Sequence, residues 1–157
     1  MGRSSQQSFP QRMIIGGDWA EEAFVEYAKH HGYQIERYGF KRIISNYTKL
    51  PAFVRHTPDY VMMSKKGGYT VECKGTGRGT SVSLKLKDIP SLIEWSDLST
   101  LLIFVYDSDK KAVALKDFKE LHTQILEENL PVNKWDVDNV EYYKIPKSWF
   151  DWEKITW

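Results

Sequence analysis

Two strand-like runs separated by a short glycine-containing loop constrain the fold of this chain most. The runs are Asp59–Met63 and Tyr69–Lys74, and the residues between them, Ser64-Lys65-Lys66-Gly67-Gly68, form a loop of hairpin length. The pattern therefore predicts an antiparallel β-hairpin whose loop spans residues 64–68. In such a hairpin, Asp59 lies near the level of Glu72–Lys74 on the neighbouring strand.

The rest of the chain predicts a mixed β-sheet flanked by helices, in one α/β domain. Helices are predicted from Asp18 to a stop at Gly32, from Asp88 or Ser91 to about Asp97, and from Asp117 to Glu128. Further strands are predicted around Tyr33–Tyr38, Ile43–Ile44, Leu101–Tyr106, Ala112–Leu115 and Val140–Ile145. Between the hairpin and the second helix, Gly75–Ser81 reads as a glycine-rich loop.

The length of 157 residues fits one domain with a single hydrophobic core. Because Met1–Gln11 is polar and rich in Ser and Gln, we expect a flexible tail over residues 1–12 and one domain over residues 13–157. No apolar stretch approaches the roughly 20 residues that span a bilayer, and no secretory signal is visible, so no membrane association is expected. The single cysteine, Cys73, favours a reducing, cytoplasmic setting, and a phage-encoded protein acting in its host cell is compatible with it.

The net charge of +1 conceals an uneven distribution along the chain. Residues 1–87 carry 14 Lys and Arg against 7 Asp and Glu, a net charge of +7, and residues 88–157 carry 8 against 14, a net charge of −6. A basic half favours a surface that binds a polyanion such as nucleic acid. Pairing of the two halves within one domain explains the same distribution equally well.

The predicted hairpin brings charged residues of both signs together. Side chains alternate between the faces of a strand, so Glu72 and Lys74 project from one face and Cys73 from the other. Carboxylate oxygens from Asp59 and Glu72 on adjacent strands suit a hard divalent cation, of which Mg²⁺ is the natural occupant. Such an ion promotes phosphodiester hydrolysis, with Lys74 holding or polarising the attacking water.

The other chemically distinctive residues favour structural roles. The four histidines show no metal-binding spacing, and Cys73 is expected to be a buried core thiol. The C-terminal tryptophans are expected to pack in the core or at a dimer interface, and stacking on unpaired bases is the alternative. They are Trp149, Trp152 and Trp157.

Pro58-Asp59, twelve intervening residues and then Glu72-Cys73-Lys74 resemble the motif of the PD-(D/E)xK nuclease superfamily. The segment Ala20–Tyr33 is similar to the first helix of archaeal Holliday junction resolvases, in which an acidic residue precedes the terminating glycine by eleven positions; here that residue is Glu21. The short podophage junction endonucleases are similar at two further places. These are Thr57-Pro58-Asp59 and the combination of Ile145, Pro146 and Trp149.

The resemblance implies a restriction-endonuclease-like core and a set of site residues. Asp59, Glu72 and the Cys73 backbone carbonyl would ligate Mg²⁺, for which Mn²⁺ would substitute, and Lys74 would activate water. Glu21 would be a further catalytic residue, as a direct or water-mediated ligand. Its spacing from Phe24 and Ala28 favours it over Glu22.

These features predict a Mg²⁺-dependent DNA endonuclease selective for Holliday junctions or other branched DNA, acting as a homodimer. A restriction-like, homing-type or repair nuclease on linear duplex or single-stranded DNA is an alternative. An alternative of another class is a non-catalytic nucleic-acid-binding or virion structural protein with the same fold. The expected DNA-backbone contacts are Arg78, Lys85, Lys87, Lys41, Arg42 and Arg55.

Overall fold

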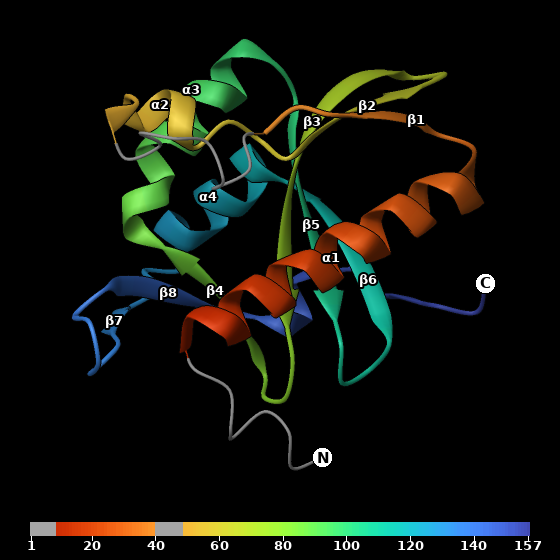
Figure 1. Cartoon of the computed structure of the whole chain (residues 1–157). Coiled ribbons are helices and arrows are strands. Elements are labelled where there is room, and N and C mark those ends of the chain that lie inside the picture. The colour runs from red at the N-terminus through yellow and green to blue at the C-terminus, as the bar shows by residue number, and fades with distance from the viewer. Residues whose placement is uncertain (1–8, 40–48) are drawn as a thin grey trace.

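The computed structural model of the chain describes residues 9–39 and 49–157 (Figure 1). The helices are α1 (Phe9–His31), α2 (Ala52–Arg55), α3 (Ile89–Leu98) and α4 (Phe118–Glu127), with short 3₁₀ turns η2 (Leu86–Asp88) and η3 (Lys147–Trp149). The strands are β1 (Gln34–Arg37), β2 (Tyr60–Ser64), β3 (Gly67–Thr76), β4 (Ser81–Lys85), β5 (Leu101–Asp107), β6 (Ala112–Asp117), β7 (Val132–Lys134), β8 (Glu141–Pro146) and β9 (Glu153–Lys154).

The strands form two sheets. Six strands make a mixed sheet in the order β1-β2-β3-β5-β6-β9, in which only β3 and β5 pair in parallel within the described residues. Three more make a small antiparallel sheet in the order β4-β8-β7. The predicted fold class, an α/β domain with a mixed sheet flanked by helices, is confirmed.

The large sheet separates two hydrophobic clusters. Helix α1 lies across one face (Figure 1), where Phe24 packs with Cys73 and Phe104. On the other face, α3, α4 and the small sheet enclose a second cluster that includes Leu92, Ile103 and other apolar side chains. As predicted, Cys73 is buried on the face of β3 opposite Glu72 and Lys74. Cys73 faces α1, and Glu72 and Lys74 face the start of α3.

The predicted start of the first helix is wrong. Helix α1 begins at Phe9, so Asp18 lies inside it rather than at its N-cap, and residues 9–12 of the expected tail are helical. Proline is well tolerated in a first helical turn, which accommodates Pro10, and the pair Gly16-Gly17 lowers helix propensity without ending the helix. The expected strand Ile43–Ile44 lies outside the described residues.

The hairpin is tighter than predicted. Ser64 pairs with Gly67, so the connection is only Lys65-Lys66, and the glycines continue the strand. Gly67 makes this possible because its φ of 138° lies in a region that glycine adopts without a steric penalty. The shift in register places Asp59, the residue before β2, level with Glu72.

Other predicted elements are confirmed near their expected bounds. Asp117 caps α4 by accepting a hydrogen bond from the Glu120 backbone N–H at 3.1 Å, and β5 is the buried strand expected from Leu101 onward. The predicted loop Gly75–Ser81 is shorter, because β3 runs to Thr76 and β4 begins at Ser81. The three C-terminal tryptophans pack against the two hydrophobic clusters.

Within residues 9–39 and 49–157, no helix combines the length and apolar character that crossing a membrane requires.

Candidate metal-dependent nuclease site

Asp59 lies where β2 separates from β3. The ladder between these strands ends at the pair Tyr60–Val71, so within residues 9–39 and 49–157 no strand pairs with β3 on that side beyond residue 71. The Asp59 carboxylate takes the place of a strand there, since its Oδ2 accepts a hydrogen bond from the Cys73 backbone N–H at 2.8 Å. This bond fixes the carboxylate beside the segment that carries Glu72 and Lys74.

Glu72 and Lys74 lie two residues apart on β3 and face the start of α3. The Lys74 Nζ atom is 3.6 Å from Glu72 Oε1 and 3.8 Å from Asp88 Oδ2. All three side chains are largely buried, with exposed fractions of 24% for Lys74, 18% for Glu72 and 19% for Asp88. One ammonium group therefore serves two carboxylates in a partly desolvated setting.

Electrostatics link Asp59 to this group. Burial is the main reason that the pKa of Asp59 is raised to about 6. The negative charge of Glu21 also raises this pKa, whereas the hydrogen bond from Cys73 lowers it. The pKa of Glu72 is raised well above its usual value, first by burial and then by the charge of Asp59. Burial lowers the pKa of Lys74, but the charges of Glu72 and Asp88 outweigh it and the net shift is upward. The two acids are thus costly to ionise together, and a bound cation would relieve that cost.

Glu21 lies on α1, the helix that covers the other face of the sheet, and its charge acts on Asp59. Its two carboxylate oxygens accept hydrogen bonds from the Arg37 guanidinium at 3.0 and 3.2 Å. Arg37 also donates to the Tyr60 hydroxyl at 3.3 Å. Glu22, the rejected alternative, is exposed and lines a groove of about 370 Å³ between α1 and the C-terminal residues.

Gly39 supports the backbone that carries Asp59. The backbone N–H groups of Tyr38 and Gly39 both donate to the Asp59 carbonyl, at 2.9 and 3.2 Å. A Cβ atom at Gly39 would lie 3.1 Å from the Pro58 carbonyl oxygen and 3.2 Å from Asp59 Cα. The close approach of the two backbone segments therefore favours glycine here.

Three polar residues near the site were not predicted as site residues: Arg37, Asp88 and His56. Asp88 was expected only as a helix cap. None of the three belongs to a spacing pattern, because each meets its partner through tertiary contacts: Arg37 contacts Glu21, and Asp88 contacts both Lys74 and His56. Gly39 carries no local signal either, since its role depends on a segment that follows it by about twenty residues.

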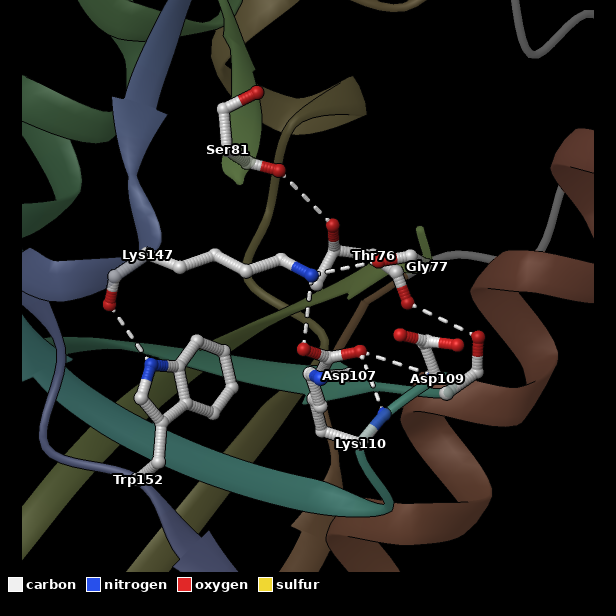
Figure 2. Close-up of polar contacts among 9 residues, drawn as sticks. Thr76, Gly77, Ser81, Asp107, Asp109, Lys110, Lys147 and Trp152 are labelled. Carbon is white, nitrogen blue, oxygen red and sulfur yellow. Dashed lines mark hydrogen bonds and ion pairs between the residues drawn. The ribbon is translucent and has the colours of Figure 1, made fainter. Parts of the chain in front are cut away.

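The loop after the active strand is anchored at its base (Figure 2). Lys147 Nζ donates to the Gly77 carbonyl at 2.6 Å and pairs with Asp107 Oδ2 at 2.8 Å, while the Thr76 hydroxyl donates to the Ser81 carbonyl at 3.1 Å. Asp107 Oδ1 accepts from the backbone N–H groups of the turn that follows β5. The loop is therefore fixed on both sides, and the exposed Arg78 lies at its outer part.

The remaining basic candidates are spread over several elements. Lys85 on β4 lies with its Nζ 5.8 Å from the centre of the Trp135 ring, Lys87 is exposed in η2, and Arg55 ends α2. Lys41 and Arg42 lie outside the described residues. The described DNA-contact candidates thus come from four different segments, namely α2, the loop after β3, β4 and η2.

Asp59, Glu72 and the Cys73 carbonyl are hard oxygen donors of the type that Mg²⁺ prefers, and the two acids fit such an ion electrostatically. Glu21 fits less directly, since both of its oxygens are engaged by Arg37. In the part of the chain that is described, no three Asp, Glu, His or Cys side chains converge in a metal-binding arrangement. A divalent cation at this place would therefore be held by the two carboxylates and the Cys73 backbone carbonyl.

Comparison with known proteins gives similarity in structure but not in sequence. No protein-family model and no curated protein sequence matches the chain. Among solved structures, the Holliday junction resolvase Hjc of the archaeon Archaeoglobus fulgidus is similar, with a TM-score of 0.48, 12% identity and 84% of each chain covered. A fusellovirus nuclease is similar with a TM-score of 0.43 and 10% identity, over 90% of this chain and 83% of the other.

Proposed function

We propose that this protein is a Mg²⁺-dependent DNA endonuclease of the PD-(D/E)xK type that cuts branched DNA such as Holliday junctions. The observation that carries the proposal is the convergence of Asp59, Glu72 and Lys74 at the point where β2 leaves β3. Two partly desolvated carboxylates with raised pKa values and an adjacent ammonium suit phosphodiester hydrolysis with a divalent cation. The sequence resemblance to resolvases supports branched DNA as the substrate.

Each site residue has a distinct task in this proposal. Asp59, Glu72 and the Cys73 carbonyl would hold Mg²⁺ or Mn²⁺, and such an ion would supply positive charge to stabilise the scissile phosphate. Lys74 orients the attacking water by donating a hydrogen bond to it. Glu21 adds negative charge near Asp59 and keeps Arg37 in place.

Binding and assembly follow from the same proposal. Arg78, Lys85, Lys87 and Arg55, together with Lys41 and Arg42, supply contacts to DNA phosphates. A chain of this size with one active site needs a second copy to cut two strands symmetrically, so we propose a C2 homodimer that acts in the cytoplasm.

Cleavage of four DNA substrates tests the activity. Purified protein is incubated with four-way junction, nicked, linear duplex and single-stranded DNA, with Mg²⁺, Mn²⁺ or EDTA. We expect cleavage of the junction in Mg²⁺ and Mn²⁺ and none in EDTA. Cleavage confined to linear or single-stranded DNA would overturn the junction preference, and tight binding with no cleavage in any metal would indicate a non-catalytic binding protein.

Substitutions test the residue roles. Asp59→Asn, Glu72→Gln and Lys74→Ala should each abolish cleavage while leaving junction binding largely intact, because none removes a phosphate contact. Near wild-type cleavage by Glu72→Gln would refute the assigned site. Glu21→Gln should reduce cleavage far more than the matched change Glu22→Gln, since Glu22 is exposed on α1.

A further inference from the structure

Asp88 occupies the position from which a side chain usually caps a helix, but it does not act as a cap. It directly precedes α3, and its side chain makes no capping hydrogen bond. Its two carboxylate oxygens are instead directed to two cationic or potentially cationic groups. Oδ2 lies 3.8 Å from Lys74 Nζ, and Oδ1 lies 3.8 Å from His56 Nε2.

The surroundings hold Asp88 in this orientation. The His56 ring is fixed on its far side by a hydrogen bond of 3.2 Å between Nδ1 and the hydroxyl of Ser91, which is only 4% exposed. Helix α2, which precedes His56, is attached to α3 by a hydrogen bond from Trp95 Nε1 to the Phe53 carbonyl at 3.1 Å. Two hydrogen bonds thus join α3, which follows Asp88, to the segment that carries His56.

Lys74 therefore has two competing acceptors, Glu72 at 3.6 Å and Asp88 at 3.8 Å. Without the Asp88 carboxylate, Glu72 would remain as the partner of the ammonium, and this pair would oppose the use of Glu72 as a metal ligand. With the Asp88 carboxylate in place, the ammonium keeps a partner when Glu72 ligates a metal ion. Asp88 can thereby pair with Lys74 while Glu72 ligates the metal ion.

We propose that Asp88 is a positioning residue that holds the Lys74 ammonium and so leaves Glu72 free to ligate the divalent cation. This inference rests on the proposed function, because it assigns Glu72 to that cation. Asp88 acts through Lys74 and contacts neither the metal nor the DNA. A purely structural role at the start of α3 is the competing explanation.

A double-mutant cycle on cation affinity separates the two explanations. The decisive substitution is Asp88→Ser, because serine is a favoured N-cap residue that preserves the helix start but removes the charge. Mg²⁺ and Mn²⁺ affinities are measured by calorimetry on DNA-free protein for the wild type, Asp88→Ser, Lys74→Met and the double variant. Asp97→Asn is the matched control, since Asp97 lies on the same helix, is 66% exposed and pairs with Lys119.

We expect Asp88→Ser to weaken cation binding about fivefold in the wild-type background and less than about twofold in the Lys74→Met background. Cleavage should show a lower kcat with little change in KM for DNA, and Asp88→Glu should restore part of the rate. An equal effect of Asp88→Ser in both backgrounds, or an affinity equal to that of Asp97→Asn, would overturn the inference. If Asp88→Ser does not fold, Asp88→Asn provides the same cycle with an isosteric side chain.

The outcomes also separate this inference from the proposed function. A wild-type protein that neither binds a divalent cation nor cuts DNA refutes the proposed function, and the role of Asp88 with it. A wild-type protein that does both, while Asp88→Ser behaves as the control does, refutes the role of Asp88 alone.

Discussion

Removing the charge of Asp59 should make the metal-free protein more stable. The pKa of this carboxyl rises from its ordinary 3.8 to about 6 in the folded chain, mainly through burial. A carboxyl with a raised pKa binds a proton more readily in the folded than in the unfolded state, so its ionisation costs stability. That cost is absent below about pH 4, grows as the pH rises toward 6, and is fully present above it.

The size of the effect follows from the pKa change. One pKa unit corresponds to about 1.4 kcal/mol, so the shift from 3.8 to about 6 costs up to about 3 kcal/mol at neutral pH. Asp59→Asn removes the charge but keeps an oxygen that can accept the Cys73 hydrogen bond. In a domain of this length, a gain of that size raises the Tm by about 6–12 °C.

Thermal and urea unfolding in EDTA, from about pH 4 to about pH 8, measures the prediction. We expect Asp59→Asn to match the wild type at the acidic end and to exceed it increasingly toward neutral pH, while Asp97→Asn, an exposed control, changes little. A variant that is less stable than the wild type at neutral pH, or a difference that does not vary with pH, would refute the electrostatic reasoning.

Three further predictions concern the supports of the site. Lys147→Met should destabilise the fold by about 3–5 kcal/mol in urea unfolding, because it leaves the buried Asp107 carboxylate without its lysine partner. The control Lys119→Met, which removes the exposed pair with Asp97, should cost at most about 1 kcal/mol. Gly39→Ala should weaken Mg²⁺ binding severalfold by calorimetry, whereas Gly68→Ala, whose new methyl meets only a flexible Met side chain, should not; equal affinities would contradict the backbone argument. Arg78→Ala should weaken binding to every DNA shape and flatten the salt dependence by about 0.9 log units per log unit, and an unchanged slope would remove Arg78 from the interface.

Local signals in the sequence predicted most of the elements around the site. Asp117 precedes an amphipathic segment and does cap α4, and the apolar run from Leu101 is a buried strand, as its composition predicts. The alternation of Glu72 and Lys74 correctly placed them on one face. These features depend on near neighbours in the chain, which is why one sequence was enough to predict them.

Features set by tertiary contacts were not accessible in this way. The hairpin register depended on whether Gly67 belonged to the loop or the strand, and a one-residue difference moved Asp59 from the level of Cys73 to that of Glu72. The predicted start of α1 was wrong because Asp18, a residue type that often caps helices, follows the glycine pair Gly16-Gly17, yet the helix begins at Phe9. The partnership of Asp88 with Lys74 depends on how α3 docks, which no spacing rule encodes.

The order in which the chain is made has a consequence for the anchored loop. Every residue proposed for chemistry precedes residue 75, but β3 pairs along its catalytic half with β5, and Lys147 ties down the loop that follows. During synthesis the charged residues are therefore made before the later segments that pack around them, because contacts between residues distant in sequence form last. The strand that flanks β3 on that side ends at Asp107, so the surroundings of the acids depend on about two thirds of the chain. A chain that stops before Lys147 contains the proposed site residues without the lysine that anchors the loop after them.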